Sequence, residues 1–239
     1  MSLPRSVVMS DETLLARAVA DALVEQVRRP GEHHIVLTGG GVGTRVLAEW
    51  AARSAEVDWD RVHLWWGDER FLPDGDPQRN ATGARAALLE LVPIPPDQVH
   101  PMPADVGQGV AQAAWDYADE LARSSPDGFV PDFAIVLLGM GPDGHVASLF
   151  PGTAAVHAGG STVPVEDSPK PPPTRVSLTL PAIRSAQKVW VVAAGEAKAD
   201  AVRSALRGDT SAQDVPAAAA RGREETVFWL DRAAAGGSE

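Results

Sequence analysis

The chain has 239 residues, of which 44% are hydrophobic, and it carries a formal net charge of −11 at pH 7. This length suits one large α/β domain or two small ones with a sizeable core, whereas the acidic balance disfavours a nucleic-acid partner, because nucleic-acid binding needs a basic face. The absence of cysteine excludes disulfides, a thiolate metal site and a cysteine nucleophile.

No apolar run approaches membrane-spanning length, and the amino-terminal residues lack the apolar stretch of a secretion signal. We therefore expect a soluble, cytoplasmic protein with no membrane partner. The basic residues are 18 Arg and only three Lys, namely Lys170, Lys188 and Lys198. Because the chain uses Arg nearly everywhere, each Lys is a candidate for a specific role, although all three also fit a solvated surface.

The first predicted element is a helix over residues 10–29. Ser10 or Asp11 can cap its amino terminus, and Pro30 and Gly31 end it. Apolar residues recur at i, i+3 and i+4 spacing and predict its buried face: Leu14, Leu15, Ala18, Val19, Ala22, Leu23 and Val27.

A short apolar strand over 34–38 runs directly into the glycine-rich loop 39–44, and a helix over 44–53 should follow. Glycines between a strand and a helix present backbone N–H groups to an anion, so the loop predicts a phosphate site; a glycine-rich tight turn is the alternative. No Gly-Lys-Ser/Thr follows, which excludes a Walker A loop. The loop also does not match the dinucleotide-binding fingerprint G-x-G-x-x-G, because the third glycine would fall on Thr44 or Val46.

The next predicted strand, 62–66, ends in Gly67, Asp68, Glu69 and Arg70. These charges lie where an open α/β sheet binds its ligands, although a salt-bridged turn is the alternative explanation. Helices are predicted near 81–91 and over 110–123. The second of these helices should bury one face, made of Trp115, Ala118 and Leu121.

The stretch 132–152 combines a buried strand, a glycine-rich loop and a helix-compatible segment. The unbroken apolar run 133–138 predicts a strand buried on both faces. The loop after it carries Asp143 and His145, and residues 146–150 fit a helix. The alternative is a tight turn in which Asp143 caps this helix and His145 is solvated.

The last third of the chain resumes the alternation of strands and helices. An exposed connection with a short strand near 162–165 leads to strands at 175–180, 189–193 and 226–230, and residues 233–239 resemble a frayed tail. Lys198 falls in the first turn of a helix that reaches residue 206. A cation there opposes the helix dipole, which favours a functional reason for it.

Four predicted strands end in polar loops that contain glycine, at Gly39, Gly67, Gly139 and Gly195. Right-handed crossovers make such strands parallel, so these loops should gather at one edge of the sheet. Together they carry anion-binding groups and a general acid/base, which predicts a phosphorylated substrate. The charged and imidazole side chains brought there are Asp68, Arg70, Asp143, His145 and Lys198, with Arg175 in reach from a neighbouring strand.

Five segments of the chain carry a resemblance to a known family: LTGGGVGTRVL at 37–47, WGDER at 66–70, GMGPDGHVASLFPG at 139–152, RVSLTLPAI at 175–183 and the segment 195–198. Through them the chain resembles the 6-phosphogluconolactonase family, within the superfamily that also holds glucosamine-6-phosphate deaminases. The resemblance implies a Rossmann-like α/β fold, a mostly parallel sheet flanked by helices in a single domain over 1–239. It also implies hydrolysis of 6-phosphogluconolactone in the oxidative pentose phosphate pathway, without a redox cofactor. We expect no other cofactor and no metal.

The resemblance also implies roles for individual residues. His145 is the expected acid/base, with Asp68 and Asp143 at the reacting end; either carboxylate could fix the histidine tautomer. Arg70 should contact the substrate or hold Asp68, and either Arg70 or backbone N–H groups of 139–145 should stabilise the oxyanion. The implied phosphate ligands are Gly39, Gly40, Gly41, Gly43, Thr44, Arg175 and Lys198.

One departure from the family concerns the first loop. The family often has Ser-Gly-Gly-Ser-Thr-Pro, whereas residues 38–43 read Thr-Gly-Gly-Gly-Val-Gly, so two hydroxyl donors are absent. Backbone N–H groups remain, and Thr38 or Thr44 could replace the hydroxyls. The expected partner is a small sugar phosphate, and we expect a monomer or a weak homo-oligomer.

Three other functions compete with this prediction. Sugar-phosphate deaminases typically continue the third motif with Asn-Glu-Pro, where this chain has Leu149, Phe150 and Pro151, and Phe150 cannot relay a proton. A non-catalytic sugar-phosphate sensor would need the cations of the pocket more than an imidazole. A dinucleotide-dependent oxidoreductase is disfavoured by the incomplete glycine fingerprint.

Overall fold

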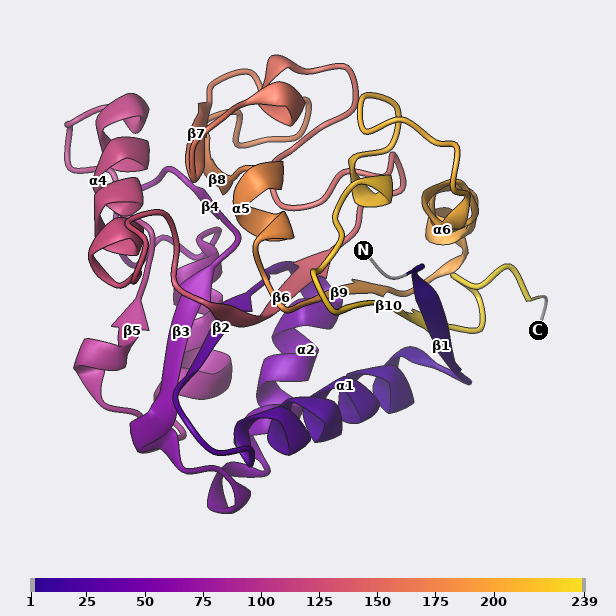
Figure 1. Ribbon diagram of the computed structural model, residues 1–239, viewed down its shortest axis with the longest axis horizontal. Coiled ribbons are helices and arrows are strands. Elements are labelled where there is room, and N and C mark those ends of the chain that lie inside the picture. The colour runs from indigo at the N-terminus through magenta and orange to yellow at the C-terminus, as the bar shows by residue number, and fades with distance from the viewer. Residues whose placement is uncertain (1–2, 238–239) are drawn as a thin grey trace.

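A seven-stranded sheet crosses the middle of the molecule in the computed structural model, which describes residues 3–237 (Figure 1). All neighbouring strands in it are parallel, and their order is β1-β10-β9-β6-β2-β3-β5. This confirms the predicted Rossmann-like fold class. The strands are β1 (Arg5–Met9), β2 (His33–Leu37), β3 (Val62–Trp66), β5 (Val99–His100), β6 (Phe133–Gly139), β9 (Lys188–Ala193) and β10 (Glu225–Asp231).

A second, antiparallel sheet of three strands lies beside the carboxyl ends of the large one. Its order is β4-β8-β7, and the strands are β4 (Asp68–Arg70), β8 (Arg175–Leu178) and β7 (Thr162–Val165). β4 follows β3 almost directly, and Gly67 N–H bonds to the Leu37 carbonyl at 3.0 Å. Pairing of β4 with β8 places Asp68 opposite Ser177 and Arg70 opposite Arg175.

Helices flank the large sheet, with α1 and α2 packed side by side on one face (Figure 1). The α-helices are α1 (Glu12–Val27), α2 (Gly40–Ala51), α3 (Asn80–Ala84), α4 (Val110–Arg123), α5 (Leu180–Arg184) and α6 (Ala199–Leu206). One π-helical turn, Arg85–Leu89, continues α3. The 3-10 turns are Ser54–Glu56, Trp59–Arg61, Pro96–Gln98, Ala154–His157, Glu196–Lys198 and Pro216–Ala218. None of the helices in this described part of the chain is long and apolar enough to cross a membrane.

The apolar composition of the central strands explains their position. Phe133 to Leu138 in β6 are all buried, as are Leu64, Trp65 and Trp66 in β3. Residues of both orientations along each strand are covered, because helices pack on the two faces of a parallel sheet. The core therefore lies between these strands and the flanking helices, and the polar residues gather where the strands end.

Two predicted helix faces needed correction. In α1, Asp11 is the cap and accepts from the Leu14 N–H at 2.9 Å, but the Leu14 side chain is 44% exposed. In α4, Trp115 is 63% exposed, whereas Tyr117 is fully buried and its hydroxyl accepts from the Trp66 N–H at 2.9 Å. That buried hydrogen bond turns Tyr117, and not Trp115, towards the core, which the spacing of apolar residues did not predict.

The predicted helix over 146–150 is also wrong. The chain there makes tight turns, in which Val146 forms bridges with Met140 and with Leu149. Ala147 has a φ of 50°, a left-handed conformation that a right-handed helix cannot contain. Burial of Val146 and Leu149 in the core accounts for these apolar residues without a helix. Asp143 therefore caps no helix.

Three other segments differ from the prediction. The strand β1 and the short strand β5 have no clear apolar pattern and were not predicted. Residues 233–237 are folded: Ala234 is buried and its N–H bonds to Asp231 Oδ1 at 2.7 Å. The remaining residues of the expected tail, 238 and 239, lie outside the described residues.

Three histidines stack on one another across the large sheet. His34 in β2 lies 4.6 Å from His63 in β3, and His63 lies 5.5 Å from His100 in β5, measured between ring centroids. Trp65 Nε1 donates to His34 Nδ1 at 3.1 Å, which requires a neutral His34 ring. Burial, with help from the other two histidines, lowers the pKa of His34 to about 4.

Residues 3–237 contain no group of three or more side chains placed to hold a metal ion.

This stack should make the protein sensitive to acid. Folding lowers the pKa of His34 from its ordinary 6.5 to about 4. Between these two pH values the unfolded state binds more protons than the folded state, so stability falls as pH drops from 6.5 towards 4. We expect His34 to account for a loss of about 2 kcal/mol in unfolding free energy between pH 7.5 and pH 5. Urea unfolding of wild type and His34→Gln at both pH values measures it. Equal losses in the two proteins would contradict the assignment.

Candidate active site

A cavity of about 390 Å³ opens at the carboxyl ends of β2, β3, β6 and β9. Such a volume suits a small-molecule ligand. The four glycine-containing loops meet there, as predicted from the parallel order of the strands. The residues that line it are Glu12, Thr38, Gly39, Gly40, Gly41, Val42, Asp68, Arg70, Asn80, Gly139, Met140, Gly141, His145, Ala147, Lys170, Arg175, Val192, Ala193, Ala194 and Lys198.

The amino terminus of α2 forms one wall of the cavity. The helix begins at Gly40, not at the predicted residue 44, so the glycines themselves supply its first N–H groups. These groups and the helix dipole create an anion site. A Cβ on Gly39 would lie 1.9 Å from Asn80 Oδ1, which explains why this position needs glycine.

Two predicted loop residues lie elsewhere. Gly43 and Thr44 are not among the residues that line the cavity. A Cβ on Gly43 would lie 2.9 Å from Thr38 Cγ2, so this glycine serves the packing of α2 on β2. Thr38 does line the cavity, and its hydroxyl accepts from the Gly139 N–H at 2.9 Å. It is therefore the better placed of the two possible hydroxyl replacements.

His145 and Asp143 form a close pair in the loop after β6. His145 Nδ1 lies 2.5 Å from Asp143 Oδ1. Because a carboxylate only accepts, Nδ1 carries the proton and Nε2 is left free to act as a base. A Cβ on Gly141 would lie 2.0 Å from His145 Nδ1 and 2.3 Å from Asp143 Oδ1, so only glycine leaves room for the pair. Asp143, and not Asp68, is thus the carboxylate that contacts the imidazole.

The surroundings of His145 favour its neutral form. Burial lowers the pKa of His145 and outweighs the hydrogen bond and charge of Asp143, which act in the opposite direction. For Asp143, burial raises the pKa, but the contact with His145 and the charge of Lys170 together bring it below its ordinary value. The pair therefore consists of an ionised carboxylate and a neutral imidazole at neutral pH, which is the state that a general base requires.

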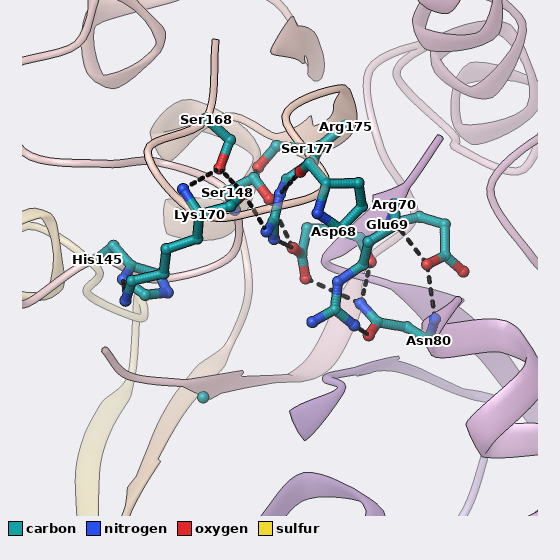
Figure 2. Close-up of polar contacts among 12 residues, drawn as sticks. Asp68, Glu69, Arg70, Asn80, His145, Ser148, Ser168, Lys170, Arg175 and Ser177 are labelled. Atoms are coloured by element: carbon teal, nitrogen blue, oxygen red, sulfur yellow. Dashed lines mark hydrogen bonds and ion pairs between the residues drawn. The ribbon is translucent and has the colours of Figure 1, made fainter. Parts of the chain in front are cut away.

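Asp68 lies at the centre of a buried polar network (Figure 2). Its Oδ2 accepts from the Ser148 hydroxyl at 2.7 Å and lies 3.9 Å from Arg175 Nη1. Its Oδ1 accepts from Asn80 Nδ2 at 3.2 Å. Neither Asn80 nor Ser148 was predicted, because no sequence pattern connects them with Asp68. The network fixes the carboxylate on the floor of the cavity.

Arg70 reaches the cavity from the same strand as Asp68. Its Nη1 donates to the Gln78 carbonyl at 3.2 Å and to Asn80 Oδ1. Its Nε is buried and has no hydrogen-bond partner among the described residues. Because Arg70 also lines the cavity, its guanidinium is held in place where an oxygen of a ligand can bind.

Glu69 connects β4, the strand that carries Asp68 and Arg70, to the start of α3. It is 1% exposed, and its carboxylate accepts from the N–H groups of Asn80 at 2.6 Å and Ala81 at 2.8 Å. Arg79 Nε lies 3.6 Å from the same carboxylate. Burial raises the pKa of Glu69, although these hydrogen bonds oppose the shift. Glu69 thus has a structural role, which the charged end of β3 did not reveal.

The remaining predicted cations, Arg175 and Lys198, both line the cavity. Arg175 is 5% exposed and commits Nε to the Pro172 carbonyl at 3.1 Å and Nη2 to the Lys170 carbonyl at 3.0 Å. The ammonium of Lys198 has no hydrogen-bond or ion-pair partner among residues 3–237. Burial, followed by the charge of Lys170, lowers the pKa of Lys198. An anion in the cavity would relieve this electrostatic cost.

Lys170 is a further cavity residue that the sequence motifs did not reveal. Its Nζ lies 3.4 Å from Asp143 Oδ1 and 3.2 Å from His145 Nδ1. The only signal in the sequence was the scarcity of lysine. The cavity therefore combines one imidazole, one buried carboxylate and four cations, from Arg70, Lys170, Arg175 and Lys198.

Comparisons with known proteins match nearly the whole chain. A family model described as glucosamine-6-phosphate isomerases/6-phosphogluconolactonase matches residues 10–229. The chain is 51% identical to the 6-phosphogluconolactonase of Streptomyces coelicolor, over 97% of this chain and 94% of that protein. It is 46% identical to the 6-phosphogluconolactonase of Mycobacterium tuberculosis, over 95% and 96% of the two chains.

Solved structures show the same fold. The 6-phosphogluconolactonase of Trypanosoma brucei superposes with a TM-score of 0.84, at 26% identity and 98% coverage of both chains. That of Thermotoga maritima superposes with a TM-score of 0.82, at 25% identity, over 97% of this chain and all of that one. A monomeric glucosamine-6-phosphate deaminase also reaches a TM-score of 0.82, over 97% and 99% of the two chains, but at 20% identity this likeness concerns the fold alone.

Proposed function

The chain belongs to the family of glucosamine-6-phosphate isomerases and 6-phosphogluconolactonases, and we propose that it hydrolyses 6-phospho-D-glucono-1,5-lactone to 6-phospho-D-gluconate. The observation that carries the proposal is the contact of His145 with Asp143 in a cavity lined by four cations. A neutral imidazole can activate water, and the cations suit a phosphorylated substrate. The high identity to relatives named 6-phosphogluconolactonase supports the same conclusion.

The substrate phosphate is proposed to bind at the amino terminus of α2, with Lys198 and Arg175 as cationic ligands. Gly40 and Gly41, the first residues of α2, line the cavity, and Lys198 offers an ammonium with no partner in the described part of the chain. The lactone ring would then lie towards Asp68 and His145.

The proposed reaction uses His145 twice. Nε2 takes a proton from water as the water oxygen attacks the lactone carbonyl carbon, and a tetrahedral intermediate forms. The imidazolium then gives the proton to the ring oxygen as the bond between this oxygen and the carbonyl carbon breaks, which yields the free acid and a hydroxyl. Asp143 accepts the hydrogen bond from Nδ1–H throughout, so the ring keeps one orientation.

Arg70 is the proposed oxyanion ligand. The alternative was the backbone of 139–145, but the N–H groups of Gly139, Gly141 and Gly144 already donate to protein oxygens at 2.9 to 3.0 Å. Arg70 in contrast lines the cavity as a cation, and its contacts with Gln78 and Asn80 hold the guanidinium in place. A fixed cation at the developing negative charge lowers the barrier without reorganisation.

Phe150 supports the lactonase over the deaminase. It is 1% exposed, and its ring lies 4.5 Å from the His145 ring. An aromatic side chain there can hold the imidazole in place but cannot relay a proton to an opening sugar ring. The residue at this position therefore supports hydrolysis more than isomerisation.

The proposal is tested with freshly generated 6-phosphogluconolactone. We expect the wild-type protein to accelerate formation of 6-phosphogluconate clearly above the spontaneous rate, and to release no ammonia from glucosamine 6-phosphate. Ammonia release without lactone hydrolysis would identify a deaminase instead. Binding of 6-phosphogluconate without any acceleration would indicate a sensor.

Two further expectations complete the proposal. A cytoplasmic location and a monomeric or weakly homo-oligomeric state both stay predictions. Size-exclusion chromatography with light scattering measures the second directly. The proposed partner is in either case a small sugar phosphate, in keeping with the size of the cavity.

A further inference from the structure

Lys170 lies beside the catalytic pair without belonging to the loop that carries it. Its ammonium is 3.4 Å from Asp143 Oδ1 and 3.2 Å from His145 Nδ1, and Figure 2 shows the side chain extending towards the His145 ring. Because the Nδ1 proton is directed to Asp143, the lysine donates to the carboxylate and lies alongside the imidazole. Two donors therefore meet at one oxygen of Asp143.

The backbone of Lys170 is anchored on both sides. Its N–H donates to Ser168 Oγ at 3.2 Å, and its carbonyl accepts from the Ser168 hydroxyl at 2.9 Å and from Arg175 Nη2 at 3.0 Å. Arg175 also binds the Pro172 carbonyl. The stem of the lysine is thus fixed to the buried cation of the small sheet, so the position of its ammonium is not left to a mobile loop.

We propose that Lys170 is a positioning residue for the reaction: its ammonium fixes Asp143, and its charge beside the ring favours the neutral imidazole before attack and proton release afterwards. The proposal rests on the proposed lactonase function for its kinetic consequences. Its effect on the imidazole, however, exists in the free protein and does not depend on any substrate.

The charges that face His145 come from three elements. Asp143 in the same loop and Asp68 in β4 favour the imidazolium, whereas Lys170 from the segment 168–173 opposes it; Phe150 covers the ring without a charge. Burial is the largest influence and acts in the same direction as Lys170. Removing the ammonium leaves the two carboxylates without this opposing charge, so the imidazolium should become more stable.

A more stable imidazolium slows the second half of the reaction. The leaving group is a ring oxygen that would depart as an alkoxide, and it needs a proton from a strong acid. The nearby ammonium makes the imidazolium a stronger acid, at some cost to its strength as a base. In addition, Asp143 without Lys170 can rotate away from Nδ1, which would disorder the ring.

The test compares Lys170→Met and Lys170→Arg with a control, Lys188→Met. Lys188 lies at the opposite end of β9 and binds Gln26 Oε1 at 2.8 Å, away from the cavity. We expect K170M to lower kcat for the lactone about tenfold to a hundredfold, as for other charged hydrogen-bond partners, with KM little changed. K170R and K188M should stay within about threefold of wild type.

The discriminating readout is the titration of the His145 ring, followed by NMR in the free proteins. The pKa of His145 should be higher in K170M than in wild type and unchanged in K188M, with K170R close to wild type. An unchanged pKa in a folded K170M protein overturns the proposal. A raised KM with an unaltered kcat also overturns it, because Lys170 would then be a phosphate ligand.

This design separates the two proposals. If the wild-type protein fails to hydrolyse the lactone, the proposed function fails, but the titration of His145 still decides whether Lys170 acts on the imidazole. Lys170→Gln provides a second variant, which retains a donor for Asp143 without the charge. If K170Q raises the pKa as K170M does, the charge is responsible; a pKa equal to that of wild type would remove the electrostatic part of the proposal.

Discussion

The His145→Ala protein is expected to hydrolyse the lactone about 10² to 10⁴ times more slowly than wild type, which is the usual contribution of a general acid/base. His145 is the only histidine among the described residues that line the cavity, and burial favours its neutral form, which can accept a proton from water. The remaining cations would still bind the phosphate, so KM should change far less than kcat. Initial rates of 6-phosphogluconate formation, corrected for spontaneous hydrolysis, measure the effect.

His157→Ala is the matched control for this experiment. His157 is exposed and contacts Gln213 outside the cavity, so its loss should leave the rate unchanged. If the His145→Ala protein kept near-normal activity while folded, the acid/base role would pass to Asp68. Circular dichroism of both variants distinguishes a lost proton transfer from a lost fold.

Asp143→Asn should have an effect of similar size, although the replacement is nearly isosteric. The carboxylate accepts a hydrogen bond from Nδ1–H, with Nδ1 and Oδ1 2.5 Å apart, whereas the amide group can rotate and donate to Nδ1. The proton of the neutral ring would then move to Nε2, and the base would face the wrong direction. An equivalent change in the serine-protease triad lowers kcat by about 10⁴, so we expect a loss of at least about 10² in kcat here.

A second carboxylate provides the comparison for Asp143. Asp68 lies in the same cavity but contacts Ser148 and Asn80, not the imidazole. Asp68→Asn should therefore leave the tautomer of His145 intact, which NMR of the ring nitrogens can verify, and the exposed Asp209→Asn should be silent in every assay. Wild-type kinetics in Asp143→Asn together with an altered tautomer in Asp68→Asn would reverse the two assignments.

The parts of the fold that could be predicted from sequence are those with local signals. The strands β2, β3, β6 and β9 are short, mostly apolar runs that lead into loops with glycine, and their parallel order follows from the handedness of the crossovers. The gathering of His145, Asp68 and Lys198 at one cavity was predictable for the same reason. The family resemblance then added roles that no periodicity could supply.

The parts that could not be predicted depend on contacts between distant segments. Lys170 lies in a proline-rich connection, and only the anchoring by Arg175 brings its ammonium to Asp143. Trp115 was predicted to lie on the buried face of α4, but Tyr117 is buried instead, because its hydroxyl accepts from the backbone N–H of Trp66. Such tertiary contacts override local preference, and a single sequence contains no trace of them.

Glycine illustrates the same limit. The glycines of the cavity indicated close approach of a ligand, and Gly40 and Gly41 fit that interpretation. Gly39 and Gly141 have a different cause, because a Cβ there would overlap Asn80 or the pair of His145 and Asp143. These two glycines make room for the protein's own side chains, and the sequence alone does not separate the two cases.

The pairing of β1 with β10 has a consequence for how the chain folds during its synthesis. β1 is the first strand in the chain, yet its only partner in the described sheet is β10, the last one, and it pairs with residues 227–231 (Figure 1). On the ribosome, residues 5–9 must therefore wait without a partner until nearly the whole chain has been synthesised. The inner strands can assemble earlier, so closure of this edge should be a late step of co-translational folding.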